Sequence, residues 1–289
     1  LYVVGGYGWK ANFVDQDGFL ITGTMTETTQ YNLENDTLDL GDDWVAFHAG
    51  EELSFDCASC HTTGYVPEGN QDDLPGLVGS WAEDSVGCEA CHGAASNHVN
   101  DPYRVSMSIE RDSEACADCH ARGDETVVEA ADGFFMHYQQ YDELFVSKKR
   151  VMTCVDCHNP HEPVKHGTGL TVKSECETCH FEQDEYQKIT DRRHARCTDC
   201  HMPRAVMSAV SDPAQFSGDM RTHLMAINSL ANSQFDNDGE TAEPYLTVEF
   251  SCRSCHNEDG RADNLSDEEL QEAAVGFHDR DQAGSLNRR

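Results

Sequence analysis

The sequence has little positive charge, because 20 Lys and Arg side chains face 53 Asp and Glu, for a net charge of −33. Binding to nucleic acid needs a basic face toward the phosphates, so this charge excludes a nucleic-acid partner. No apolar run approaches the roughly 18 residues of a membrane-spanning helix, so no membrane span is expected. Leu is scarce and only 38% of the 289 residues are hydrophobic, so the apolar side chains alone would form a thin core.

No cysteine is left outside one short pattern, C-x-x-C-H. The pattern occurs seven times and accounts for all 14 cysteines. The cysteines are Cys57, Cys60, Cys88, Cys91, Cys116, Cys119, Cys154, Cys157, Cys176, Cys179, Cys197, Cys200, Cys252 and Cys255. The histidines that follow them are His61, His92, His120, His158, His180, His201 and His256. We number these motifs 1 to 7 in chain order.

Three kinds of chemistry use paired cysteines, and they differ in what they ask of the histidine. Structural disulfides need no histidine after the second cysteine. A zinc site needs a second cysteine pair or a distant Cys/His pair, and gives the adjacent histidine no role. Covalent c-type haem uses every element, because two thiols add to the vinyl groups and the next histidine binds the iron. The sequence therefore predicts seven covalently attached haem c groups with these seven histidines as proximal ligands.

Seven porphyrins would supply the apolar body that the side chains lack. We therefore expect a mostly irregular chain with short α-helices and a small N-terminal β element, organised around a chain of haems. Residues 1–47 form the β element packed on the haem core, and residues 48–289 form one heptahaem domain. Because haem is attached to thiols outside the cytoplasm, the protein is expected to be secreted to the periplasm or the cell exterior. The chain begins at Leu1 without Met, as after removal of a signal or at a processed end.

Four local patterns add detail to this expectation. Residues 2–4 and 19–22 are β-branched or aromatic, which indicates a hairpin or small sheet. Residues 132–147 suggest a longer helix or a turn, and the polar residues 211–245 suggest a surface excursion. Ser266 precedes three acidic residues, which is typical of an N-cap that opens a helix through about residue 275.

Eight further histidines remain after the seven proximal ones, enough to give every iron a second histidine. The predicted distal ligands are His48, His98, His137, His161, His194, His223 and His278. His166 is the expected spare, because His161 already serves the same short segment. An iron with two strong protein ligands has no open position, so the histidine surplus favours electron transfer. An enzyme would need at least one open haem, and the sequence leaves that alternative standing.

Several stretches around the motifs resemble a known group of proteins. They are Tyr7-Gly8-Trp9-Lys10, Cys57 to Tyr65, Gly87 to Gly93, Cys154 to His161, Cys197 to Pro203, and Arg221-Thr222-His223. In these stretches the chain resembles the multihaem c-type cytochromes of the periplasm and cell exterior, in the branch of the tetrahaem cytochrome of ammonia oxidisers. The resemblance implies that His98, His161, His194 and His223 are distal ligands. The C-x-x-C-K site of the pentahaem nitrite reductases is absent.

The leading hypothesis is an extracytoplasmic heptahaem cytochrome that moves electrons between redox partner proteins or extracellular acceptors, and is not an enzyme. The haem density also resembles that of extracellular cytochrome filaments, so a homopolymer with haem ligation between subunits is one form of this hypothesis. The ligands for such a contact would be His48 and His278. The alternatives are a soluble periplasmic shuttle and a multihaem reductase of a small nitrogen or sulfur oxyanion with one open haem.

Overall fold

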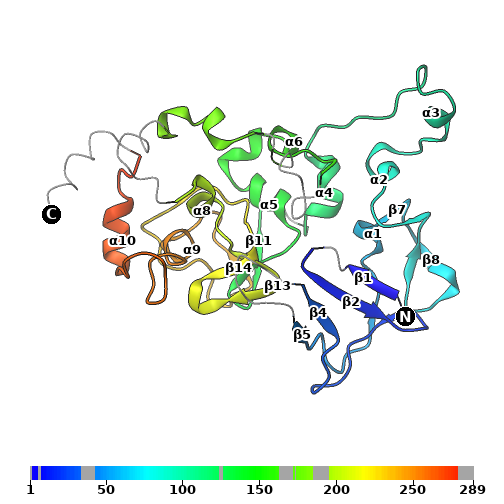
Figure 1. Cartoon of the computed structure of the whole chain (residues 1–289), viewed down its shortest axis with the longest axis horizontal. Coiled ribbons are helices and arrows are strands. Elements are labelled where there is room, and N and C mark those ends of the chain that lie inside the picture. The colour runs from blue at the N-terminus through cyan, green and yellow to red at the C-terminus, as the bar shows by residue number, and fades with distance from the viewer. Residues whose placement is uncertain are drawn as a thin grey trace. The chain divides into compact units, whose positions relative to one another are not determined.

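A computed structural model describes residues 2–5, 8–33, 43–123, 126–162, 172, 174–184 and 195–278. Two histidines of the predicted set, His166 and His194, lie outside these ranges. The chain divides into two compact units, Leu1–Cys119 and His120–Arg289, whose elements are labelled in Figure 1. Among the described helices, none is long and apolar enough to cross a bilayer.

The first unit is built on an antiparallel sheet whose strands follow the order β5-β4-β2-β3-β6, with β1 also paired to β2. Its strands are β1 (Tyr2–Gly5), β2 (Lys10–Val14), β3 (Phe19–Leu20), β4 (Gln30–Asn32), β5 (Asp43–Val45) and β6 (Leu53–Ser54). Two small hairpin-like pairs follow, β7 (Thr62–Thr63) with β10 (Glu83–Asp84), and β8 (Val66–Asn70) with β9 (Val78–Ser80). The predicted N-terminal β element is therefore present, and it continues past residue 47 into β6.

Short helices carry the motifs of the first unit. Motifs 1 to 3 lie on α1 (Ala58–His61), α2 (Cys88–His92) and α4 (Glu114–His120), the last of which ends one residue beyond the unit. Two further short helices, η1 (Gln71–Asp73) and α3 (Ser96–Asn100), lie between them. A small core of Val14, Phe55, Ala58 and Leu77 joins the sheet to α1. This core requires a close backbone approach, because a Cβ at Gly76 would lie 2.3 Å from the Gly18 carbonyl carbon.

The second unit contains a sheet that the sequence did not lead us to expect, with strand order β14-β13-β12-β11-β15. Its strands are β11 (Val128–Ala131), β12 (Phe134–Met136), β13 (Val206–Asp212), β14 (Ser217–Met220) and β15 (Thr241–Ala242). Strands β12 and β13 run parallel, with Phe135 opposite Val206. The described helices are α5 (Gln140–Phe145), η2 (Lys148–Val151), α6 (Cys154–Cys157), η3 (Cys176–Thr178), α8 (Cys197–His201), η4 (Pro213–Gln215), α9 (Val248–Cys252) and α10 (Asp267–Ala274).

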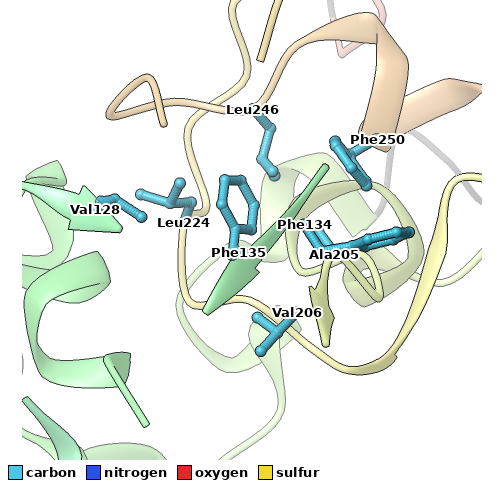
Figure 2. Close-up of a cluster of buried hydrophobic side chains, with 8 residues drawn as sticks. All are labelled: Val128, Phe134, Phe135, Ala205, Val206, Leu224, Leu246 and Phe250. Atoms are coloured by element: carbon cyan, nitrogen blue, oxygen red, sulfur yellow. The ribbon is translucent and has the colours of Figure 1, made fainter. Parts of the chain in front are cut away.

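The core of the second unit gathers around β12. Figure 2 shows its eight buried side chains, Val128, Phe134, Phe135, Ala205, Val206, Leu224, Leu246 and Phe250. Phe250 has its ring centre 5.9 Å from that of Phe134 and 5.8 Å from that of Phe135. These residues come from distant parts of the chain, so the aromatic cluster closes the sheet onto α9.

Two of the four local expectations hold in full and two need correction. Ser266 caps α10 through a hydrogen bond from the Glu269 backbone N–H, and the predicted hairpin is β1 to β3. Only residues 140–145 of the segment 132–147 are α-helical, because β12 occupies its first half. The expected surface excursion at 211–245 was wrong, because it contains two strands of the sheet and buried polar side chains such as Gln234.

Candidate haem-binding sites

Most of the seven motifs occupy a single helical turn. Motifs 1, 2, 3, 4 and 6 lie on α1, α2, α4, α6 and α8, motif 5 lies on η3, and motif 7 begins at the end of α9. In motifs 1, 4, 5 and 7 the histidine backbone N–H donates to the carbonyl of the first cysteine, at 3.1, 2.9, 2.9 and 3.0 Å. Residues i, i+3 and i+4 share one face of a helical turn. The spacing therefore turns both thiols and the imidazole toward the same side.

All fourteen thiols are available for a bond to a prosthetic group. None forms a disulfide, and every cysteine is exposed or half-buried. Within the described ranges, no three His, Cys, Asp or Glu side chains converge as a metal cluster. The geometry thus supports neither a disulfide framework nor a zinc site made of described residues.

Several imidazoles are oriented by a bond to Nδ1. His92, His201 and His256 pair through Nδ1 with the backbone carbonyl oxygens of Ser108, Met225 and Asp263, at 2.6, 2.8 and 2.9 Å. The distal candidate His98 does the same with the Val105 carbonyl at 2.6 Å. A carbonyl can only accept, so Nδ1 donates its proton and the lone pair lies on Nε2. This is the arrangement that fixes a metal-binding histidine in place.

Two predicted distal histidines face proximal ones. The ring centres of His158 and His223 lie 6.0 Å apart, and so do those of His201 and His278, whose planes are inclined by only 24°. A metal–imidazole bond is about 2 Å and the ring centre lies about 1 Å beyond, so two imidazoles on one iron have centres about 6 Å apart. The ring spacing in both pairs therefore matches that of two imidazoles on one iron.

Apolar side chains are left exposed beside the motifs. Val86 precedes motif 2, Val151 precedes motif 4 and Phe181 follows motif 5, with exposed fractions of 56%, 85% and 62%. Around His98, Val99 and Tyr103 are 73% and 98% exposed. Exposed apolar surface gathered at one kind of site indicates a ligand or partner that covers it. A porphyrin held by the neighbouring cysteines fits this surface.

Motif 5 differs from the two histidine pairs. The Lys149 ammonium nitrogen lies 2.9 Å from His180 Nε2, the nitrogen that would bind an iron. Burial and the charges of Lys149 and His201 lower the pKa of His180. A cationic side chain therefore lies at the nitrogen that would bind the iron of motif 5, in contrast to the two histidine pairs.

Three other predicted distal histidines make contacts of different kinds in the described chain. His48 is half-exposed, with Nδ1 3.3 Å from Glu51 Oε2, and its φ is +44°. His137 packs edge-on against the Tyr138 ring, and the His161 backbone N–H donates to Asn159 Oδ1 at 3.2 Å. As distal ligands these three remain predictions, and so do His194 as a ligand and His166 as the spare.

The His158–His223 pair lies next to a buried acid that the sequence did not single out. Glu143 is 1% exposed and accepts a hydrogen bond from the His223 backbone N–H. Burial raises the pKa of Glu143 to about 8 and lowers the pKa of His223 to about 4, with the charges of His158 and His120 adding to the second shift. Both side chains are therefore neutral at pH 7. Glu143 follows Asp142 in sequence, and two adjacent acidic residues predict a surface position rather than a buried one.

Neighbouring motifs in the first unit come close together at their thiols. The Cys60 thiol lies 3.6 Å from the Asp118 carbonyl oxygen, which places motif 1 beside motif 3. Burial raises the pKa of Cys119 to about 11, with further contributions from Cys60 and from Cys91. Motifs 1, 2 and 3 are therefore neighbours.

In the second unit the remaining motifs follow one another in chain order. Burial, and then the charge of His120, lowers the pKa of His158. Burial raises the pKa of Cys157, followed by the charge of Asp156 and then those of Cys176 and Cys179. Motifs 5 and 6 meet where the Cys197 thiol lies 3.9 Å from Glu177 Oε1. Burial, and then the charges of Cys252 and Cys255, raises the pKa of Cys200 to about 12. These charges lie on motif 7, so motifs 6 and 7 are neighbours.

Arginines connect motifs 6 and 7, and the sequence analysis assigned them no role. Arg261 contacts the Cys255 thiol at 3.2 Å and Asp199, between the motif 6 cysteines, at 3.4 Å. Arg221 donates to Asp199 at 3.1 Å and to the Thr198 and Met202 carbonyls. Arg253 binds the Leu265 carbonyl at 2.7 Å and the Asp267 carboxylate. Arg261 therefore joins motif 6 to motif 7 directly. Arg221 fastens motif 6 to the segment after β14, and Arg253 fastens motif 7 to the start of α10.

Comparisons with known proteins give a family pattern for one segment and a likeness of fold for most of the chain. Residues 41–93 match the family of cytochrome c554 and c-prime. No curated protein matches the chain by sequence. The outer cell wall cytochrome OcwA is similar in structure, with 17% identity, a TM-score of 0.55, and coverage of 97% of this chain and 75% of OcwA. The octahaem sulfite reductase MccA of Wolinella succinogenes has 15% identity and a TM-score of 0.60, over 95% of this chain and 61% of MccA.

An undecahaem cytochrome from the S-layer of Carboxydothermus ferrireducens also matches, with 21% identity and a TM-score of 0.43, over 71% of this chain. The chain spans 44% of the length of that cytochrome, as against 61% of MccA. At these identities the likeness concerns the fold. The chain has the fold of the multihaem c-type cytochromes, and its residues 41–93 match the pattern of cytochrome c554 and c-prime.

Proposed function

We propose that this protein is an extracytoplasmic heptahaem cytochrome that moves electrons along a chain of haems. The observation that carries the proposal is the pairing of His158 with His223 and of His201 with His278, each with ring centres 6.0 Å apart. A closed, six-coordinate iron suits electron transfer because no position is open to substrate. When bound, haem c supplies a one-electron iron couple.

The chain's own residues would hold and tune these groups. The seven cysteine pairs anchor them, and the seven adjacent histidines bind from the proximal side. His223 and His278 bind from the distal side in motifs 4 and 6. The remaining distal ligands are those predicted from the sequence, His48, His98, His137, His161 and His194. The carbonyls at the Nδ1 atoms of His92, His98 and His256 fix those rings, which keeps Nε2 directed at the metal.

The order of motifs proposed for electron transfer follows their contacts. Motifs 1 and 2 both adjoin motif 3 through Cys60, Cys91 and Cys119. From His120 the neighbours continue through motifs 4, 5, 6 and 7. Tunnelling falls steeply with distance, so the protein's task in this proposal is to keep successive groups close. In this order, electrons could enter at motif 1 or at motif 2, and both routes continue through motif 3 to motifs 4, 5, 6 and 7.

The proposed setting is the periplasm or the cell exterior. Haem attachment to thiols takes place outside the cytoplasm, and OcwA, which shares the fold, is described as an outer cell wall cytochrome. The net charge of −33 would keep such a surface hydrated and repel acidic partners. The proposed partners are redox proteins with a basic docking face, or extracellular electron acceptors.

Haem content and iron coordination test the proposal directly. The chain would be produced with a haem-attachment system, and its intact mass and haem absorbance would be measured. We expect seven haems, an electron paramagnetic resonance spectrum dominated by low-spin iron, and reoxidation of all haems by one added acceptor. Fewer than seven haems, or mainly high-spin iron, would contradict it.

The assembly state separates the filament from the shuttle. In the filament form, a histidine of one copy would bind an iron of the next, and half-exposed His48 remains the donor predicted for that contact. His278 lies against His201 of its own chain, which favours an internal role for it. A single species at the monomer mass in size-exclusion chromatography, with no fibres in negative stain, would rule out the polymer.

A reductase with one open haem is the second candidate, and Lys149 is the observation that favours it. Its ammonium group at the Nε2 atom of His180 would attract a small anion to that position. Carbon monoxide binding to the reduced protein distinguishes the two functions. One bound molecule per chain that is lost in a C179S variant, which disrupts motif 5, would support the reductase, and no binding would support the closed carrier.

A further inference from the structure

Glu143 is a buried acid with no assigned task, and it lies at the His158–His223 pair. It sits on α5 and is 1% exposed. Its Oε2 accepts from the His223 backbone N–H and lies 3.9 Å from His223 Nδ1. Its other oxygen, Oε1, is buried without a hydrogen-bond partner, and so is His223 Nδ1. A buried polar atom without a partner destabilises the folded chain, so two such atoms in one carboxyl–imidazole pair need an explanation.

The other oriented histidines show what is missing at His223. His98, His201 and His256 each pair Nδ1 with a backbone carbonyl, at 2.6 to 2.9 Å. No carbonyl takes that position at His223, and the Glu143 carboxyl is the acceptor that faces its Nδ1. When the lone pair of Nε2 binds a metal, Nδ1 carries the proton and needs an acceptor. A short movement of the Glu143 side chain would provide it.

We infer that Glu143 is the positioning residue of His223: its carboxyl group accepts one hydrogen bond from the His223 backbone N–H and a second from the Nδ1–H of the His223 ring. This inference rests on the proposed haem between His158 and His223. The two bonds would fix both the place of the ring and its rotation. A separate acidic residue would then do for this iron what backbone carbonyls do at motifs 2, 6 and 7.

Loss of the acceptor has a defined electronic effect. An imidazole whose Nδ1–H is hydrogen-bonded donates more strongly and stabilises ferric iron. Replacing Glu143 by Met removes the acceptor at similar size, so we expect the reduction potential of one haem to rise. A tenfold change in its oxidised-to-reduced ratio corresponds to 59 mV for one electron. E143Q keeps an acceptor oxygen, so it should restore most of the wild-type value.

The experiment follows each haem by potentiometric titration with electron paramagnetic resonance, on the full haem-loaded protein. E143M, and E143A as a second variant of the same kind, should shift one low-spin signal and its potential, and E143Q should return both toward wild type. Asp142 is the matched control, because it is equally buried on α5 but accepts the Arg122 backbone N–H at 2.7 Å. D142N should leave every signal unchanged.

Two results would overturn the inference, and a third would overturn its basis. Wild-type signals in both E143M and E143A, or an equal shift in D142N, would show that Glu143 acts only in packing. An H223A variant should convert one haem to high spin. If H223A changes no iron, the proposed pair itself is wrong, whereas a response in H223A with none in the Glu143 variants refutes only the role of Glu143.

Discussion

Removal of His278 should open one iron and leave the others closed. The His201 and His278 rings have centres 6.0 Å apart, and His278 lies in the short turn after α10, so H278A deletes an imidazole without cutting into the core. If seven motifs each hold one haem, one iron in seven should become high-spin. Reduced H278A should then bind one carbon monoxide per chain more than wild type.

The geometry also predicts which signal disappears. The planes of the two rings are inclined by 24°, close to parallel, and near-parallel axial imidazoles give a rhombic low-spin spectrum. The signal lost in H278A should therefore be a rhombic one. The loss of a strong nitrogen ligand should also raise the potential of that haem, because ferric iron depends more on the donor than ferrous iron does.

Controls separate ligand loss from a change in folding. Added imidazole should restore the low-spin signal of H278A, since it supplies the missing ring. F277L alters the neighbouring ring of the same turn, whose centre lies 5.1 Å from that of His278, and should keep the wild-type spectrum. An H278A protein with seven low-spin haems and no added carbon monoxide binding would refute the assignment of His278.

Three further predictions concern the fold. F250A should lower the free energy of unfolding by about 3–5 kcal/mol, because the ring fills the core around β12. The denaturant concentration at the unfolding midpoint should fall accordingly, and a loss below about 1 kcal/mol would contradict this role of the ring. G76A should lower it by about 3 kcal/mol in the same assay, since its Cβ would meet the Gly18 backbone at 2.3 Å, and an unchanged midpoint would disprove the close approach. Hydrogen bonds, the strongest from the Thr241 hydroxyl, lower the pKa of Asp236 below its usual value of 3.8. The stability that these bonds contribute is therefore present above pH 3.8 and is lost as the pH falls through the lowered pKa. The NMR signal of the Thr241 amide should titrate below pH 3.8, and D236N should abolish that titration.

The haem-binding motifs were predictable because their geometry is local. Residues i, i+3 and i+4 of one turn share a face wherever the turn is placed, so the spacing in Cys154, Cys157 and His158 already fixes their common side. The distal partner depends on the fold. His223 reaches His158 only because β13 and β14 bring it back across the second unit, and no local pattern contains that information.

The second sheet was missed because its strands are short and its pairing is non-local. Strand β15 has two residues, and β12 pairs in parallel with β13 from far along the sequence. The many polar residues in 211–245 also led to the wrong expectation of a surface excursion. Asp219 is 2% exposed because it accepts the backbone N–H groups of Ser208, Ala209 and Val210, where β13 bulges away from β14. A buried carboxylate satisfied in this way looks like a surface residue in sequence.

The thin core and the exposed apolar side chains have one physical explanation. The described chain buries a small hydrophobic cluster in the second unit and a smaller one in the first, while Tyr103, Val151 and Phe181 are exposed to solvent. Each flat porphyrin placed against such side chains would remove apolar area from water at about 25 cal/mol per Å². Thioether attachment would also shorten the loops that the unfolded chain can explore, as a disulfide does. The few apolar side chains of the sequence would then pack around β12 and α1, and the haems would provide the remaining buried apolar surface.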